Sequence, residues 1–265
     1  MSPLDKRVKL FFEETGHGEE TIVFSHGLLF DHRMWHHQVA HFSSRYRCVA
    51  YDHRGQGKSE LKPPFDMDTL YEDAAALIEQ VSPGKPVHFV GLSMGGFVGM
   101  RLAARKPHLI KSLTLLDTSA EPEPNKFKYR VLSFIFKTMG PRPVSKRIVS
   151  ILFGRSTLHD PSKRELVDQW RQTIEQYPAS ITAAVAGVID RAGVLDEISS
   201  IRLPVQVLVG DEDVATVPTK SMKIHAHIPG SHLHQIARAG HSSCLEQPQK
   251  VNMLLENFFN SLKGG

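Results

Sequence analysis

The chain has 265 residues, of which 41% are hydrophobic and 23% are charged. This composition is typical of a globular protein and excludes a chain that is disordered throughout. The two cysteines, Cys48 and Cys244, are too few for a disulfide framework or a four-cysteine zinc site. The first residues lack the apolar run of a signal peptide, and no segment approaches the ~20 apolar residues of a membrane-spanning helix. We therefore expect a soluble, cytoplasmic protein.

The net charge of +4 is unevenly distributed along the chain. Residues 126–155 contain eight basic side chains and no acidic one, whereas the rest of the sequence carries 24 basic and 28 acidic residues. A charged run of this kind is most often a solvated helix face. The alternative is docking to an anionic partner: an acidic carrier protein, a membrane surface or a carboxylate substrate. No nucleic-acid-binding motif accompanies the run, so a nucleic-acid partner is not expected.

The first 120 residues alternate short apolar runs with helical patterns, which predicts a mostly parallel sheet with helices on both faces. Glycines at 16 and 18 separate the first two runs and predict a hairpin between them. The expected strands are Val8–Phe12, Thr21–Ser25, Cys48–Tyr51, Val87–Gly91 and Leu113–Asp117, and the expected helices are Thr69–Val81 and Met94–Lys106.

The pattern changes after residue 120, where prolines begin to separate helical stretches and strand signals stop. A further strand, Val205–Gly210, precedes two more helices, Thr219–His227 and Pro248–Leu262. The sequence therefore predicts an α/β core formed by residues 1–120 and 201–265, with a four-helix lid, residues 121–200, inserted before the last strands. The lid helices are expected at Lys126–Thr138, Val144–Phe153, Ser162–Tyr177 and Ile181–Arg191.

The segment Gly91-Leu-Ser-Met-Gly95 fits the G-x-S-x-G nucleophile elbow and lies between a predicted strand and a predicted helix. The sharp turn needs glycines because Cβ atoms two residues before and after the serine would collide with nearby backbone. It also places the serine hydroxyl at a helix N-terminus, where the dipole favours negative charge. A glycine-rich packing turn would explain the pattern too, but this context favours Ser93 as a nucleophile.

With this motif the chain resembles the α/β-hydrolase superfamily, and four further motifs follow the family's order. They are Ser25-His-Gly27, Tyr51-Asp-His-Arg-Gly-Gln-Gly-Lys-Ser59, Gly210-Asp-Glu-Asp213 and Gly240-His241. Within the superfamily, Gly91-Leu-Ser-Met-Gly-Gly96 and Leu116-Asp-Thr-Ser-Ala120 are similar to 3-oxoadipate enol-lactonases and small carboxylesterases. The resemblance implies the α/β-hydrolase fold and a serine hydrolase.

A serine nucleophile needs a base and an acid that orients the base. His241 lies in the loop before the final helix, where the family's catalytic histidine is found, and serine, acid and histidine follow in the expected order. In the resembling enzymes the aspartate three residues after the strand-end glycine is the acid, which implies Asp213. Asp117 is the rival because some members place the acid one strand earlier. Asp211 is interpreted as a loop carboxylate.

The backbone N–H groups of Leu28 and Met94 are expected to form the oxyanion hole, because they follow the His26-Gly27 turn and the nucleophile. His26 itself is interpreted as a residue that stabilises this turn. The chain lacks the HGGG run of one lipase and esterase branch.

Other motif-like segments predict no cofactor and no metal. Gly55-Gln-Gly-Lys-Ser59 resembles the end of a phosphate loop, but position 52, which should be glycine, is Asp52. The histidine pairs at 32/36 and 37/41 lack the glutamate of the H-E-x-x-H zinc motif, so a solvated or interfacial helix face explains them.

The expected activity is hydrolysis of a carboxylic ester or lactone through an acyl-enzyme. Three alternatives remain open: a cofactor-free perhydrolase or haloperoxidase, a carbon–carbon bond hydrolase, and a hydrolase-fold ligand receptor with slow turnover. All three are compatible with the same triad, since fold does not settle function. Serine at position 93 argues against epoxide hydrolases and haloalkane dehalogenases, which have aspartate there.

Overall fold

A computed structural model describes residues 8–62 and 65–263 of the chain. Within this part, a seven-stranded sheet has the order β1-β3-β2-β4-β5-β6-β7, and every neighbouring pair is parallel except β1 with β3. This confirms the predicted fold class. The strands are β1 (Phe12–Thr15), β2 (Thr21–Ser25), β3 (Arg47–Tyr51), β4 (Val87–Leu92), β5 (Ile110–Leu116), β6 (Val205–Gly210) and β7 (His232–Ile236).

The expected hairpin between the first two strands is wrong. β1 pairs antiparallel with β3, with Phe12 opposite Tyr51, and β3 in turn pairs with β2. β3 therefore lies between the two strands that are adjacent in sequence. The glycines that suggested a tight turn lie instead where the chain passes close to the segment before β3. A Cβ at Gly18 would lie 2.1 Å from the carbonyl oxygen of Arg45 in that segment. Glycine is needed here because it lets another segment approach the backbone closely, and not because the chain turns back into a hairpin.

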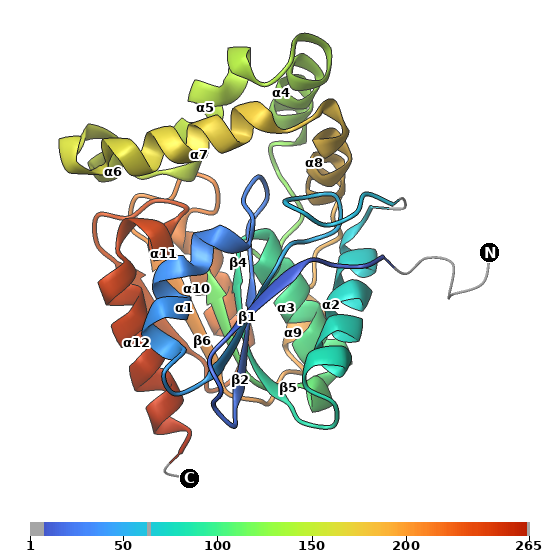
Figure 1. Ribbon diagram of the computed structural model, residues 1–265, viewed down its shortest axis with the longest axis vertical. Helices are drawn as coiled ribbons and strands as arrows, with labels where there is room; N and C mark the ends of the chain where they lie inside the picture. The colour runs from blue at the N-terminus through green and yellow to red at the C-terminus, as the bar shows by residue number, and fades with distance from the viewer. Residues whose placement is uncertain (1–7, 63–64, 264–265) are drawn as a thin grey trace.

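Side chains alternate between the two faces of the sheet, and each face is covered by helices (Figure 1). In β2, for example, Val23 packs in one apolar cluster while Ile22 and Phe24 pack in the other. The first cluster is covered by α2 (Met67–Val81), α3 (Met94–Arg105), α9 (Leu195–Ile198) and α10 (Pro218–His227), and the second by α1 (His36–Phe42), α11 (Ser243–Glu246) and α12 (Pro248–Ser261).

Between β5 and β6 the chain forms a group of helices that covers one end of the sheet (Figure 1). We call α4–α8 the inserted helices: α4 (Lys126–Met139), α5 (Arg142–Leu152), α6 (Arg155–His159), α7 (Arg164–Gln176) and α8 (Thr182–Ile189). The four expected helices agree with α4, α5, α7 and α8 to within a few residues, and the structure adds the short α6. Phe136, Trp170 and Ile174 of this group belong to the same apolar cluster as Phe30 and Leu92 of the core.

Strand β7 was not expected from the sequence. It is the edge strand beyond β6, and only Ile236 of its five side chains is buried. Because His232, His234 and Gln235 are exposed, the strand lacks the apolar run that marks the inner strands. No helix in the described ranges is both long enough and apolar enough to cross a membrane.

Candidate active site

Ser93 lies on the sharp turn between β4 and α3. Its φ of 51° and ψ of −108° place a non-glycine residue in strained backbone. The turn excludes side chains on both sides: a Cβ at Gly91 would lie 2.4 Å from the carbonyl oxygen of Gly95, and a Cβ at Gly95 would lie 2.2 Å from that of Ser25. These contacts are the physical reason for both glycines. The turn leaves Ser93 on the wall of a cavity that His241 also lines.

The His241 and Asp213 side chains meet in two loops that follow neighbouring strands. Nδ1 of His241 lies 2.9 Å from Oδ2 of Asp213, and both side chains are buried. Asp213 is held by three further bonds: its Oδ1 accepts from the N–H groups of Ala215 and Thr216, and its Oδ2 accepts from the Thr216 hydroxyl at 2.8 Å. The carboxylate is therefore fixed in position before any substrate binds.

Each member of this pair changes the protonation of the other. Burial alone would lower the pKa of His241, but the charge of Asp213 and the hydrogen bond to it outweigh burial and raise that pKa above its ordinary value. Burial would raise the pKa of Asp213, but His241 and the hydrogen bonds from Thr216 lower it below the usual range. Asp213 is thus ionised at neutral pH, and its acceptor oxygen keeps the proton of neutral His241 on Nδ1.

Asp117, the rival acid, is buried at the end of β5 but does not bond to the histidine. Its Oδ1 accepts from the N–H of Gly210 at 2.8 Å, and its Oδ2 accepts from the N–H and hydroxyl of Ser243. Burial, together with the negative charge of Asp213, raises the pKa of Asp117 to about 7. The geometry therefore pairs His241 with Asp213, whereas Asp117 ties the ends of two strands to the start of α11.

The turn after β2 brings Leu28 to the cavity that contains Ser93. The next amide, that of Leu29, is already used, because it donates to Oε1 of Gln56 at 2.9 Å. Nε2 of the same Gln56 side chain contacts Sδ of Met94 at 3.7 Å. Gln56 therefore connects the two turns that carry the Leu28 and Met94 amides. Sequence reasoning gave this residue no role of its own: Gln56 appeared only within the Tyr51–Ser59 family motif and the rejected phosphate-loop motif.

His26 holds the same turn from the inside, as expected. Its Nε2 accepts from the N–H of His53 at 3.0 Å, so Nδ1 carries the proton and donates to the carbonyl of Gly27 at 2.7 Å. Burial lowers the pKa of His26, which favours this neutral form. His26 acts on the backbone and does not line the cavity around Ser93.

The cavity over Ser93 is walled mainly by apolar side chains from the core and the inserted helices. The core supplies residues of the turn after β2, of α3 and of the loops after β6 and β7. Helices α4, α5 and α8 supply most of the others, and Glu123 and Arg191 lie just outside α4 and α8. The apolar lining residues are Leu28, Leu29, Phe30, Phe97, Leu132, Phe136, Ile148, Ile151, Leu152, Val185, Val188, Ile189 and Ala215. A pocket of this kind suits an apolar ligand group.

One buried ion pair interrupts the apolar wall. Nη1 of Arg191 lies 3.3 Å from Oε2 of Glu123, and its guanidinium stacks over the ring of Phe97 at 4.4 Å. Tyr129 and Ser133 of α4 line the same cavity. The cavity therefore offers a polar side as well as an apolar one. Sequence reasoning did not single out Glu123 or Arg191, because no motif connects positions so far apart.

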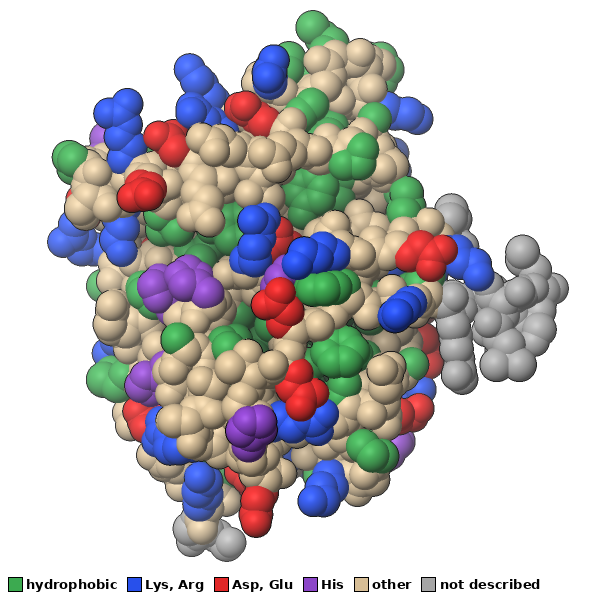
Figure 2. Space-filling model, in the orientation of Figure 1, with side chains coloured by type: hydrophobic (Ala, Val, Ile, Leu, Met, Phe, Trp, Pro, Cys, Tyr) green, Lys and Arg blue, Asp and Glu red, His purple; other side chains and the backbone are tan. Residues whose placement is uncertain are grey.

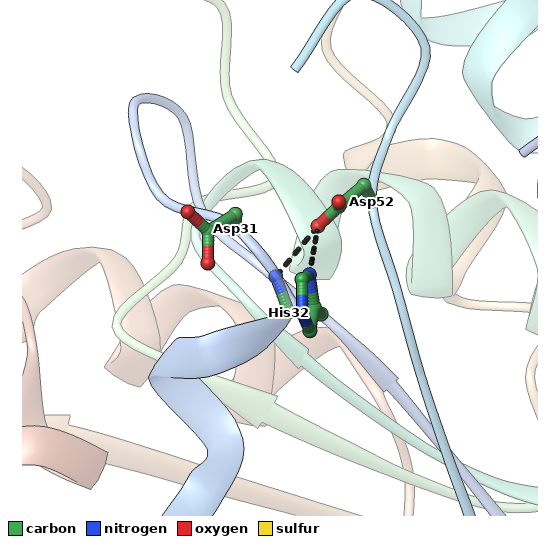
Figure 3. Close-up of side chains that lie close together, drawn as sticks. All are labelled: Asp31, His32 and Asp52. Carbon is green, nitrogen blue, oxygen red and sulfur yellow. Dashed lines mark hydrogen bonds and ion pairs between the residues drawn. The ribbon is translucent and has the colours of Figure 1, made fainter. Parts of the chain in front are cut away.

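Figure 3 shows a second cluster of acidic and histidine side chains, Asp31, His32 and Asp52. None of the three lines the cavity over Ser93. Oδ1 of Asp52 accepts from both the N–H and Nδ1 of His32, at 2.7 and 2.8 Å, while Asp31 is paired with Arg33. These bonds already occupy the donor atoms that a metal would need. His32 is therefore a buried structural residue, and the expectation of a solvated or interfacial helix face is wrong for it.

Comparison with known proteins gives a family for this arrangement. Residues 22–254 match the alpha/beta hydrolase family, and the chain belongs to that family. A 3-oxoadipate enol-lactonase 2 of Acinetobacter baylyi is 28% identical, with 89% of this chain and 86% of the relative aligned. A Mycobacterium tuberculosis protein with the provisional name non-heme bromoperoxidase BpoC is 29% identical over 97% of this chain and 99% of its own. The structure of a thermophilic esterase from Thermogutta terrifontis superposes with a TM-score of 0.88 at 27% identity, covering 96% of this chain and 94% of that one.

Proposed function

We propose that the chain is a serine hydrolase that cleaves a carboxylic ester or lactone, with Ser93 as nucleophile, His241 as base and Asp213 as the acid that orients it. The observation that carries the proposal is the 2.9 Å contact between His241 and Asp213, with His241 and Ser93 on the wall of one cavity. Esterase and enol-lactonase relatives support the same reaction class.

In the proposed reaction, Oγ of Ser93 attacks the substrate carbonyl while Nε2 of His241 takes the hydroxyl proton. The N–H groups of Leu28 and Met94 stabilise the oxyanion of the tetrahedral intermediate. Collapse breaks the ester bond, and His241 donates its proton to the leaving oxygen, which produces an alcohol and an acyl-enzyme. Water then attacks the acyl carbon while His241 takes its proton. The bond from that carbon to Oγ of Ser93 breaks, His241 returns the proton to Oγ, and the carboxylic acid leaves. Asp213 remains ionised throughout.

The substrate we propose is small to medium in size, with an apolar group on its carbonyl. The apolar lining from α4, α5 and α8 supports this, and so does the position of the inserted helices over the strand ends (Figure 1). Residues 121–200 would then act as a lid on the core formed by residues 1–120 and 201–265, except that α9 at the end of this range packs on the sheet with the core. The proposed reaction needs no metal or organic cofactor, because the triad and the backbone amides supply every group it uses.

A second candidate is a cofactor-free perhydrolase, which the similarity to the bromoperoxidase-named relative favours. In that reaction hydrogen peroxide replaces water and attacks the acyl-enzyme, which releases a peroxyacid and restores the Ser93 hydroxyl. The same residues would act in the same roles.

The test is steady-state hydrolysis of p-nitrophenyl esters of increasing acyl length, together with a panel of lactones. We expect turnover by the wild type and none by Ser93→Ala, with equal thermal stability of the two proteins. Bromide oxidation in the presence of acetate and hydrogen peroxide measures the perhydrolase. Turnover that survives Ser93→Ala would refute the proposal, and peroxyacid formation faster than ester hydrolysis would favour the second candidate.

A further inference from the structure

Helix α4 has apolar side chains on two opposite sides, although only one of them faces the protein. Successive residues of a helix turn by about 100°. Leu132 and Phe136 therefore lie together on the side that lines the cavity, whereas Phe127 and Phe134 lie on the side directly opposite. A helix with apolar residues on both sides is normally covered on both sides, by protein or by membrane.

The outer side of α4 is exposed to an unusual degree. The exposed fractions are 82% for Phe127, 42% for Val131, 66% for Phe134 and 69% for Met139 at the helix end. The first three fall within about 60° of one another around the helix axis, so they form one stripe. We call Phe127, Val131 and Phe134 the outer stripe. Large apolar side chains gathered on one exposed surface mark an interaction site.

Basic side chains border the outer stripe on both sides. Lys128 follows Phe127 on one side of the helix, and Arg130 and Lys137 lie on the other. Arg130 is paired with Asp190 at 2.7 Å, but no carboxylate of the described residues lies within ion-pair distance of Lys128 or Lys137. Figure 2 shows hydrophobic and basic side chains together at the end of the molecule where α4 lies. No acidic residue occurs between positions 126 and 155.

We propose that the outer face of α4 docks on the surface of a membrane that contains anionic lipid. A helix that lies in a membrane interface combines phenylalanine or leucine on one side with flanking lysine and arginine, which is the arrangement of Phe127 and Phe134 between Lys128 and Lys137. The phenylalanines enter the boundary of the acyl chains, and the long lysine side chains reach the lipid phosphates. The rest of the chain has a net charge of −4, so the anionic surface also orients the molecule with α4 toward it.

This docking would place the inner side of the same helix, and the cavity that it lines, next to the membrane. Leu132 and Phe136 form part of the cavity wall, less than one helix diameter from the outer stripe. A substrate dissolved in the membrane would then have a short path to the cavity. The docking itself uses no residue of the triad, so it can be measured whether or not the proposed hydrolysis is correct.

The experiment is sedimentation of the full chain with vesicles, comparing pure phosphatidylcholine with a mixture of phosphatidylcholine and phosphatidylserine. We expect binding to the mixed vesicles, little binding to the neutral ones, and weaker binding as salt increases. Lys128→Glu with Lys137→Glu should weaken binding at least about 25-fold, because each basic residue near an anionic surface contributes about fivefold. Phe127→Ser with Phe134→Ser should weaken it at least about tenfold.

The matched control is Lys250→Glu with Met253→Ser, which changes an exposed basic residue and an exposed apolar one on α12, away from the inserted helices. It should bind as the wild type does, and all variants should retain the wild-type melting temperature. Absence of binding to the mixed vesicles, equal binding to neutral ones, or an equal loss in the control would overturn the proposal. Retention on immobilised polyglutamate without vesicle binding would assign the face to an acidic protein. A concentration-dependent dimer that Phe127→Ser abolishes would assign the outer face of α4 to a second copy of the chain. Either of these two results would also refute the membrane-docking proposal.

Discussion

Replacing Asp213 with asparagine tests the proposed acid at a single atom. In the structure Oδ1 of Asp213 accepts two backbone N–H groups, and Oδ2 faces Nδ1 of His241 at 2.9 Å. Asparagine keeps the first two bonds if its oxygen takes the Oδ1 position, so its NH₂ group then faces the histidine. A donor at that place requires Nδ1 to accept, which moves the histidine proton to Nε2. His241 in that tautomer cannot take the proton of Ser93.

We therefore expect Asp213→Asn to lower kcat for p-nitrophenyl acetate by about 10⁴-fold, which corresponds to about 5 kcal/mol of activation free energy. The melting temperature should change little, because the bonds to the Ala215 and Thr216 amides are retained. The measurements are steady-state kinetics, phosphonate labelling of Ser93, and thermal unfolding followed by circular dichroism.

Asp117→Asn is the matched control. It places an NH₂ group among the donors from Gly210 and Ser243, so it should lower the free energy of unfolding by about 1–3 kcal/mol. Its kcat should stay within about tenfold of the wild type, because Asp117 has no hydrogen bond to His241. The reverse result, a crippled Asp117→Asn and a mild Asp213→Asn, would refute the assignment of the acid.

Three further changes test the surroundings of the site. The charge of Asp213 and its hydrogen bond raise the pKa of His241, and His241 must be neutral to act as a base. The rate constant kcat/KM should therefore fall on the acid side with a midpoint above about pH 6.5, and a lower midpoint would contradict this. Gly95→Ala places a Cβ 2.2 Å from the Ser25 carbonyl oxygen, and it should lower the free energy of unfolding by about 3 kcal/mol or more, which an unchanged calorimetric melt would exclude. Gln56→Leu removes the acceptor of the Leu29 amide next to the proposed oxyanion hole, and it should lower kcat about 10- to 100-fold, whereas Gln56→Glu, which keeps an oxygen there, should lose less; equal losses would exclude the hydrogen bond as the cause.

The sequence was informative wherever a function is encoded in a local pattern. The turn around Ser93 needs two glycines at fixed spacing, and the strand-end loops that carry Asp213 and His241 follow recognisable glycines. The structure brings the last two together as expected, and the comparisons confirm the family. The roles of these residues stay predictions.

What the sequence could not predict depends on contacts between distant segments. Gln56 gains its place from Leu29, 27 residues earlier, and no spacing rule connects them. The pairing of β1 with β3 is another example, because the local glycine pattern is the same whether a strand returns to its neighbour or passes beside another one. Strand β7 was missed for a different reason. It is an edge strand whose side chains are mostly exposed and polar, so its sequence lacks the apolar run by which the buried strands were recognised.

The apolar cluster that continues from the sheet into the inserted helices has a consequence for how the protein unfolds. Trp170 and Ile174 of α7 pack in the same apolar cluster as Phe30 of the core. Separating the inserted helices from the sheet would therefore expose buried apolar side chains on both of them. The inserted helices therefore belong to the cooperative unit of folding, and heating should produce one transition and not a separate early melting of this segment. Movement that admits a substrate must then occur by local displacement of a helix such as α4, of whose side chains only Phe136 is buried.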